Sequence, residues 1–375
     1  MTAPRSSDAI VVGAGIVGAA CAAALARDGW RVTVIEKAFA ASGTTAAGMG
    51  HLVVMDDSPE QLALTTYSEQ LWRELEPELD ARSEIDHCGT LWVAEDESQL
   101  DALNAKRDAY ATAGVASEIL DARALAEAEP QLRPGLAGAL RVLDDSVVYP
   151  PGVALRLLEL ARHSGARVLE GREVTGFVAN GVLLRDGRLG ADAIVNAAGA
   201  FAAALTPGLP IVPRKGHLAI TDRLPGFCRH QLVELGYLAS AHVMTSESVA
   251  FNVQPRRTGQ VLVGSSRELA GWDPSINRRI LARMLSRATD FLPALSRAPV
   301  IRCWTGFRPA TPDKLPLIGR WESTPGLWIA AGHEGLGITT SLGTARLIAD
   351  QIAGRPTAIP CDPFAPMRAV SAEHV

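Results

Sequence analysis

The sequence predicts an α/β protein with a discontinuous Rossmann-type domain, joined to an α+β domain built on an antiparallel sheet. Residues 10–36 read as strand, glycine turn, helix and second strand. Strand signals between 211 and 266 follow one another without long helices, which is typical of antiparallel sheets. The chain then returns to strand, glycine-rich turn and helix over 326–354, so we expect the first domain to be completed there.

The first element carries the most specific motif. Gly13, Gly15 and Gly18 form G-x-G-x-x-G directly after an apolar β-branched run. Gly13 allows a tight turn, Gly15 lets the backbone approach a pyrophosphate, and Gly18 lets the helix pack close to the sheet. The helix N-terminus offers free N–H groups to phosphates. Glu36 follows the second strand, where a carboxylate accepts ribose hydroxyls, so a dinucleotide site is predicted.

The later elements follow from periodicity, caps and turn residues. We expect helices over 59–79, 97–113, 121–129, 153–164 and 341–354. We expect strands over 89–94, 167–169, 193–198 and 326–331, and a hairpin at 181–189. The predicted division is 1–50, 145–207 and 304–375 for the nucleotide-binding domain, and 51–144 and 208–303 for the substrate-binding domain.

Composition narrows the class of protein. The chain has 375 residues, of which 47% are hydrophobic and 21% charged, enough for two cores. A net charge of −5 argues against nucleic-acid binding. The five cysteines are scattered without C-x-x-C, which argues against a metal site, an iron–sulfur cluster or a disulfide framework. The N-terminus is too short and polar for a signal peptide, and no apolar run spans a bilayer, so we expect a cytoplasmic protein.

Four segments together carry a family resemblance: VVGAGIVGAACAAALARDGWRVTVIE (11–36), GTTAAGMG (43–50), IVNAAGAFA (194–202), and WTGFRPATPDKLPLIG with GLWIAAGHEGLGITTS (304–341). They resemble the D-amino-acid oxidase type of flavoprotein, on the side of glycine oxidase and D-amino-acid dehydrogenase. Within it, GMGHLVVMDD and SVAFNVQPRRTGQVLVGSSRE are similar to bacterial D-hydroxyproline dehydrogenases. The resemblance implies FAD as cofactor.

The resemblance also assigns residues to parts of FAD. Glu36 would hold the adenosine ribose, Val174 the adenine, and the first glycines the pyrophosphate. The loop after Gly332 would bring backbone N–H groups to the flavin's pyrimidine edge. The implied cofactor-binding residues are Gly13, Gly15, Ile16, Val17, Gly18, Glu36, Lys37, Thr44, Thr45, Ala47, Gly48, Met49, Val174, Ala198, Gly199, Gly306, Arg308, His333, Glu334, Gly335, Leu336, Gly337 and Ile338.

The predicted substrate residues are Arg308, Asn252, His51 and Met49. Arg308 lies in W-T-G-F-R-P, where similar glycine oxidases carry the arginine that binds the substrate carboxylate, and its planar fork suits that task. A solvated surface arginine is the alternative. Asn252 stands where those enzymes carry a tyrosine, which favours a cyclic or hydroxylated substrate over glycine. His51 either faces the substrate, tunes the flavin or is a packed histidine; His333 is expected beside the flavin.

Cys303 raises the question of a covalent cofactor. In the related sarcosine oxidases a cysteine in this region bonds the flavin. Here the spacing to T-P-D is longer and the arginine motif intervenes, so we expect a free thiol and non-covalent FAD.

The resemblance implies oxidation of a D-amino or D-imino acid, with cis-4-hydroxy-D-proline as the best candidate, a cyclic imine as product and hydride passing from Cα to flavin N5. The alternatives are a glycine- or sarcosine-type oxidase that produces H2O2, and the FAD subunit of a larger complex. The implied partners are a small amino or imino acid and an electron acceptor: a quinone, a dye or a partner subunit. Peripheral membrane association and a homo- or hetero-oligomeric state are left open.

Overall fold

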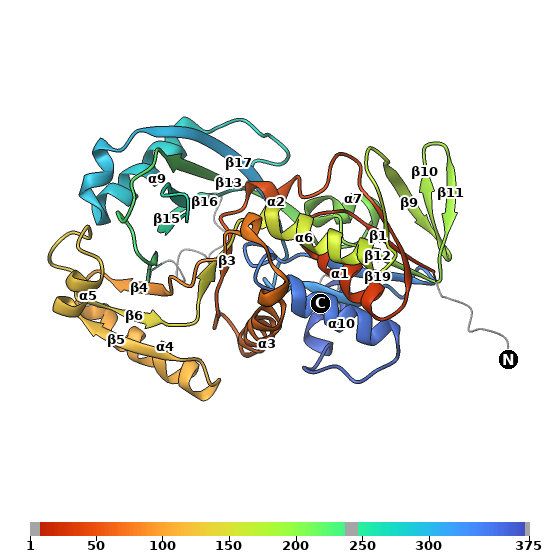
Figure 1. Cartoon of the computed structure of the whole chain (residues 1–375), viewed down its shortest axis with the longest axis horizontal. Helices are drawn as coiled ribbons and strands as arrows, with labels where there is room; N and C mark the ends of the chain where they lie inside the picture. Colours follow the sequence, from red (N-terminus) through yellow and green to blue (C-terminus); the bar gives the residue numbers. More distant parts are fainter. Residues whose placement is uncertain (1–7, 237–246, 372–375) are drawn as a thin grey trace.

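The computed structural model describes residues 8–236 and 247–371 (Figure 1). The prediction that no signal peptide precedes the first strand concerns residues 1–7, which lie outside this range. Two large sheets lie toward opposite ends of the molecule, with the short strand β3 between them (Figure 1). This arrangement confirms the predicted α/β class with a second domain built on its own sheet.

The first sheet has six strands, and its inner strands are parallel. In spatial order they are β18 (Leu317–Arg320), β19 (Leu327–Ala331), β12 (Ala193–Asn196), β1 (Asp8–Val12), β2 (Arg31–Ile35) and β8 (Arg167–Leu169). Side chains of β1 alternate between the two faces: Ala9 and Val11 join one core, Ile10 and Val12 the other. Helices α1 (Ile16–Arg27), α6 (Pro150–His163), α10 (Ser341–Ile352) and α3 (Pro59–Leu75) pack in and around the first core. The small sheet β11 (Gly187–Gly190), β10 (Gly181–Leu184) and β9 (Val174–Val178) covers the second.

The second sheet has eight strands. In spatial order they are β17 (Val300–Ala310), β13 (Val212–Thr221), β16 (Val261–Glu268), β15 (Glu247–Pro255), β14 (Gln231–Glu234), β4 (Thr90–Ala94), β6 (Gly138–Val142) and β5 (Ser117–Asp121). Its pairs are antiparallel as predicted, except that β14 runs parallel to β4. Helix α9 (Arg278–Phe291) buries Met284, Ala288 and Phe291 against one face and forms a separate core there.

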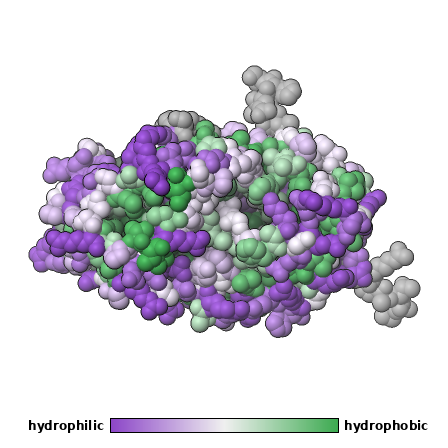
Figure 2. All heavy atoms as spheres, turned by 90° about the horizontal axis from the view of Figure 1, so that it is seen from above, coloured by the Kyte–Doolittle hydropathy of each residue, from purple (hydrophilic) through white to green (hydrophobic). Residues whose placement is uncertain are grey.

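The other strands and α-helices of the described residues are the strands β3 (His51–Leu52) and β7 (Ser146–Val147), and the helices α2 (Thr44–Ala47), α4 (Leu100–Thr112), α5 (Ala122–Ala128), α7 (Ala202–Leu205) and α11 (Pro366–Ser371). Short 3-10 helices also occur between these elements. Among the described residues no helix is long and apolar enough to cross a membrane. Hydrophilic residues alternate with small hydrophobic patches on the face seen in Figure 2.

Strand β17 joins the two halves. It pairs along its whole length with β13, yet it also touches the N-terminal half. The Thr44 hydroxyl donates to the Phe307 carbonyl oxygen at 2.7 Å, and a Cβ added at Gly306 would lie 2.5 Å from the Cβ of Ala47. The predicted domain boundary at 303/304 falls within this strand; the division itself stays a prediction.

Candidate active site

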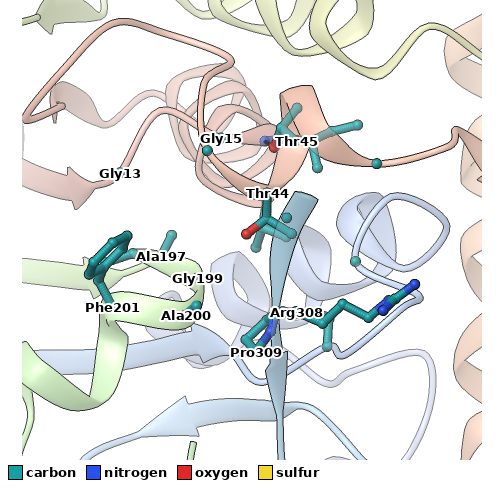
Figure 3. Close-up of a pocket in the computed structure, with 18 of the residues that line it drawn as sticks. Gly13, Gly15, Thr44, Thr45, Ala197, Gly199, Ala200, Phe201, Arg308 and Pro309 are labelled. Atoms are coloured by element: carbon teal, nitrogen blue, oxygen red, sulfur yellow. Dashed lines mark hydrogen bonds between the residues drawn. The ribbon is translucent and has the colours of Figure 1, made fainter. Parts of the chain in front are cut away.

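The principal cavity, of about 330 Å³, lies where the glycine turn after β1 approaches the face of the second sheet. Its walls come from this turn, from residues 42–51, 172–174 and 197–205, from strands β13 and β15–β17, and from the loop 333–338. In Figure 3 the glycine turn and Thr45 lie along one side, and the side chain of Arg308 runs away from Pro309 and from residues 197–201.

The glycine turn is shaped as the motif predicts. Gly13 has φ +105°, and a Cβ there would lie 2.6 Å from the Ala197 carbonyl oxygen, so only glycine fits. A Cβ at Gly18 would lie 2.0 Å from the carbonyl oxygen of Gly13. Gly18 does not line the cavity, and its absence of a side chain serves helix packing. The Ile16 N–H donates to the Thr45 hydroxyl at 3.0 Å, which holds α2 against the start of α1.

Glu36 is fixed at the end of β2 by two backbone groups. Its carboxylate accepts hydrogen bonds from the N–H groups of Ala14 and Ala38, each at 2.9 Å, and it lines the cavity. Each carboxylate oxygen has a second lone pair, so both oxygens can still accept from a ribose. The turn, the helix N-terminus and this acid together fit an adenine dinucleotide.

Sequence reasoning did not find the aromatic corner beside this acid. Phe201 stacks on Trp272 with ring centroids 4.4 Å apart, and the Lys37 ammonium lies 3.2 Å above the Phe201 ring. Lys37 and Phe201 line the cavity. Trp272 comes from a loop distant in sequence, so no local pattern joined it to Phe201.

Arg308 lies inside the site and is not a solvated surface arginine. Its Nη1 donates to the Ser266 carbonyl oxygen at 2.9 Å. A Cβ added at Gly216 would lie 2.3 Å from that same Nη1. The guanidinium therefore crosses β13 over a glycine and reaches β16, and Arg308 lines the cavity.

His51 and Asn252 lie side by side in the cavity wall. His51 Nδ1 lies 2.7 Å from Gln231 Oε1, and His51 Nε2 lies 3.4 Å from Asn252 Nδ2. Burial lowers the pKa of His51 to about 4, and the nearby charge of Arg308 acts in the same direction. Asn252 Oδ1 and the hydroxyl of Ser265, also on the cavity wall, are buried without a hydrogen-bond partner. Gln231 and Ser265 were not predicted as site residues.

Met49 packs on the sheet side of the cavity. Its carbonyl oxygen accepts from Gln254 Nε2 at 2.8 Å, and a Cβ at Gly264 would lie 2.8 Å from its sulfur. Met49 belongs to a small apolar cluster with Leu218 and Leu262. The structure thus places it as a packed wall residue that lines the cavity.

Glu334 lies among three arginines. Its carboxylate accepts from Arg267 Nε at 3.1 Å and lies 3.8 Å from Arg214 Nη1. Burial raises the pKa of Glu334, but the charges of Arg267, Arg308 and Arg214 outweigh burial and lower it to about 2. The Gly335 N–H donates to the same carboxylate at 2.6 Å, so this N–H is directed to Glu334 in the structure.

Of the other predicted residues in the loop 333–338, Leu336 alone does not line the principal cavity. His333 is buried, its Nε2 lies 2.9 Å from the Thr344 hydroxyl, and burial lowers its pKa to about 3. Leu336 lines a neighbouring cavity of about 70 Å³ and not the principal one. The predicted residues that line the principal cavity are Gly13, Gly15, Ile16, Val17, Glu36, Lys37, Thr44, Thr45, Ala47, Gly48, Met49, His51, Val174, Ala198, Gly199, Asn252, Gly306, Arg308, His333, Glu334, Gly335, Gly337 and Ile338.

Cys303 lies on the other side of β17. It packs against the core under α9, beside its strand partner Ala219, and burial raises the pKa of its thiol. Arg308 and Gly306 extend toward the cavity instead. The thiol therefore does not line the predicted flavin site, which supports non-covalent binding.

The parallel sheet carries the glycine turn, and the antiparallel sheet brings an arginine to the same cavity. This combination defines the class of protein as a dinucleotide-dependent oxidoreductase. Comparison with known proteins makes this specific. The chain belongs to the FAD dependent oxidoreductase (DAO) family, which matches residues 8–351. Its cofactor is therefore FAD, for which the turn, the acid at Glu36 and the cavity fit.

Named relatives cover most of the chain. It is 29% identical to a glycine oxidase of Pseudomonas putida over 96% of this chain and 98% of the relative. It is 28% identical to the hydrogen cyanide synthase subunit HcnC of Pseudomonas aeruginosa, with 92% of each covered. It is 33% identical to a D-amino acid dehydrogenase of Cereibacter sphaeroides, over 71% of this chain and 61% of that protein.

Solved structures show the same fold. Glycine oxidase from Geobacillus kaustophilus aligns with a TM-score of 0.86 at 27% identity, covering 97% of this chain and 99% of that one. Iminodiacetate oxidase from Chelativorans sp. aligns with a TM-score of 0.82 at 27% identity, covering 96% and 98%. The chain is thus similar throughout to flavoenzymes named as amino acid oxidases and dehydrogenases.

Proposed function

We propose that this chain is an FAD-dependent dehydrogenase of D-amino or D-imino acids, and that its substrate is cis-4-hydroxy-D-proline. The product would be the cyclic imine 1-pyrroline-4-hydroxy-2-carboxylate. The observation that carries the proposal is one cavity wall that presents both the Arg308 guanidinium and the partnerless carbonyl oxygen of Asn252. The names of the D-amino acid dehydrogenase and iminodiacetate oxidase relatives agree with an amino or imino acid substrate.

Arg308 is assigned to the substrate carboxylate. A carboxylate matches the planar fork of a guanidinium, and charge-assisted pairs of this kind fix orientation as well as charge. Because Nη1 is anchored on Ser266, the fork is held in place before the substrate arrives. The grip would turn the Cα–H of the substrate toward the cofactor.

The Asn252 side chain on this wall favours a hydroxylated substrate. A buried acceptor without a partner costs about 1–3 kcal/mol, so Asn252 Oδ1 favours a ligand that donates to it. Glycine has no side chain with a donor. A ring hydroxyl supplies one, which supports hydroxyproline over glycine.

Bound FAD supplies the acceptor for the two electrons that leave Cα. The protein's part is to hold the carboxylate and to receive the substrate with a neutral amine. His51 and His333 have lowered pKa values, about 4 and about 3, because removal from water disfavours the charged form of each ring. Both are therefore neutral at physiological pH and add no positive charge beside the amine.

Two alternatives have their own support. The glycine oxidase relatives favour an oxidase acting on glycine or sarcosine. The HcnC relative, named as a subunit, favours an FAD chain that passes electrons to a partner. All five cysteines lie in the described part of the chain and are free, which supports the cytoplasmic location we propose.

The test is anaerobic mixing of the purified flavoprotein with cis-4-hydroxy-D-proline, D-proline, glycine and sarcosine, with the flavin absorbance recorded. We expect bleaching by the D-prolines, slow recovery in air and fast recovery with an artificial dye. Bleaching by glycine or sarcosine with fast recovery in air would establish an oxidase instead. If the bleached flavin is reoxidised only after a second protein chain is added, the subunit alternative would be established.

A further inference from the structure

We propose that Gln231, His51 and Asn252 form a hydrogen-bonded chain that holds the Asn252 carbonyl oxygen as the acceptor for the substrate's ring hydroxyl. The inference rests on the proposed function, because it assigns the hydroxyl of a hydroxylated cyclic amino acid to one atom of the site. Asn252 contacts the substrate. Gln231 and His51 are positioning residues that act through it.

The register of the second sheet places two of the three side chains together. Strands β14 and β15 are antiparallel, with Val233 opposite Asn252. Gln231 is two residues from Val233, so its side chain lies on the same face as that of Asn252. His51 comes from β3, which lies outside this sheet and pairs with β7, and its ring bonds to both side chains.

The chemistry of each side chain determines which atom donates and which accepts along these hydrogen bonds. The atom of Gln231 that faces the ring is Oε1, at 2.7 Å, and an amide oxygen only accepts. His51 Nδ1 therefore carries the proton. Because the ring is neutral, Nε2 has none and accepts from Asn252 Nδ2 at 3.4 Å.

This direction determines what Asn252 offers the substrate. With its amide nitrogen turned to His51, its oxygen is the atom left for another partner. Asn252 is 5% exposed, and Oδ1 is buried without a partner on the wall of the principal cavity. A hydroxyl donor would satisfy this oxygen, whereas plain proline would leave it unpaired.

Arg308 and Asn252 line the same cavity, so one small ligand can contact both of them. The guanidinium reaches the Ser266 carbonyl on β16, and Asn252 stands on β15, the neighbouring strand. Neighbouring strands lie about 4.8 Å apart. Ser266 is also two residues along β16 from Gly264, the register partner of Asn252, so the two groups are offset along the strands as well as across them. A carboxylate at Arg308 and a hydroxyl at Asn252 would thus be held from adjacent strands.

The first experiment measures kcat/KM for cis-4-hydroxy-D-proline and for D-proline in matched variants. Asn252→Leu should lower the ratio of the two values by about 10- to 100-fold, mostly through the hydroxylated substrate. Gln231→Met keeps the length but removes the acceptor, and should lower the ratio by about 3- to 10-fold, since the imidazole can then take either tautomer. Gln260→Met, at a half-buried glutamine outside both cavities, should leave the ratio unchanged. An unchanged ratio in Asn252→Leu would overturn the inference.

The second experiment requires no turnover. Histidine-selective ¹⁵N spectra, with His51 identified by its loss in His51→Leu, report which ring nitrogen carries the proton. We expect the proton on Nδ1 in the wild-type protein and a mixed or reversed tautomer in Gln231→Met. A proton on Nε2 in the wild type would reverse the chain and overturn the inference. If neither cis-4-hydroxy-D-proline nor D-proline reduces the flavin, the proposed function fails. The spectra still decide whether Gln231, His51 and Asn252 are hydrogen-bonded in the proposed direction.

Discussion

Replacing Arg308 by lysine tests the placement of the active site most directly. The change keeps a positive charge but removes the fork, and it removes the anchoring bond from Nη1 to Ser266. One of the two charge-assisted hydrogen bonds to the substrate carboxylate is then lost, which at about 1.5–3 kcal/mol is roughly 10- to 10²-fold in kcat/KM. The anchor is present with and without substrate, so its loss acts by misplacing the charge, which can cost up to about a further 10²-fold. The expected fall is therefore roughly 10- to 10⁴-fold.

The assay is dye-coupled oxidation of cis-4-hydroxy-D-proline, with FAD content measured on the same preparations. Arg278→Lys on the exposed surface of α9 is the matched control and should behave as wild type. Arg308→Lys should retain FAD, because its effect concerns the substrate. A variant with full FAD and unchanged kcat/KM would falsify the assignment of the carboxylate to Arg308.

Three further predictions follow from single contacts. Gly216→Ala would place a methyl group 2.3 Å from Nη1 of Arg308, so we expect kcat/KM to fall at least about 10-fold with FAD retained, as measured by the same assay. Acid precipitation should release the cofactor from the wild type and from Cys303→Ser alike. A wild-type precipitate that stays yellow, beside a colourless Cys303→Ser precipitate, would show a covalent bond to Cys303. Burial raises the pKa of Asp145 to about 8, so the folded state binds a proton that the unfolded chain loses above the ordinary carboxyl pKa, and stability declines from about pH 4 to 8. Asp145→Asn removes this decline and can still accept from the Val54 N–H, so its melting temperature should exceed that of the wild type by at least about 2 °C at pH 8 and by less at pH 5.

The parts of the fold that the sequence predicted are those encoded locally. The glycine turn, the helix after it and the acid at Glu36 lie within one contiguous segment, and each is where the motif predicts. The predicted helix start at Pro59 is also confirmed, and the hydroxyl of the preceding Ser58 caps it by accepting from the Gln61 N–H. Local signals specify local structure because the hydrogen bonds that they satisfy are themselves local.

The parts that were missed divide into two kinds. Helix α9 had a readable signal: Asn277 caps it, and Ile280, Met284 and Phe291 recur on one face. Strand β17 had none, because its sequence mixes charged, aromatic and proline residues, and its ladder to β13 joins segments about ninety residues apart. The predicted start of helix α6 at 153 was three residues late, since Pro150 begins the helix at a position where a missing N–H costs nothing.

In the site, too, contacts between residues distant in sequence could not be predicted. Arg308 was found because its motif is contiguous, but its neighbours Arg214 and Arg267 come from two other strands, and both reach Glu334. Glu334 has φ +47°, a backbone conformation that costs energy in a non-glycine residue and is tolerated where its surroundings fix it. Here the cause is visible: the turn directs the carboxylate to the arginines, which hold it ionised, while its backbone N–H donates to Pro309, next to Arg308. Glu334 thus ties the loop predicted to meet the flavin to the strand predicted to hold the substrate. We expect this charged contact to set the relative position of cofactor and substrate. A contact between segments so far apart in sequence can be recognised only once both are folded.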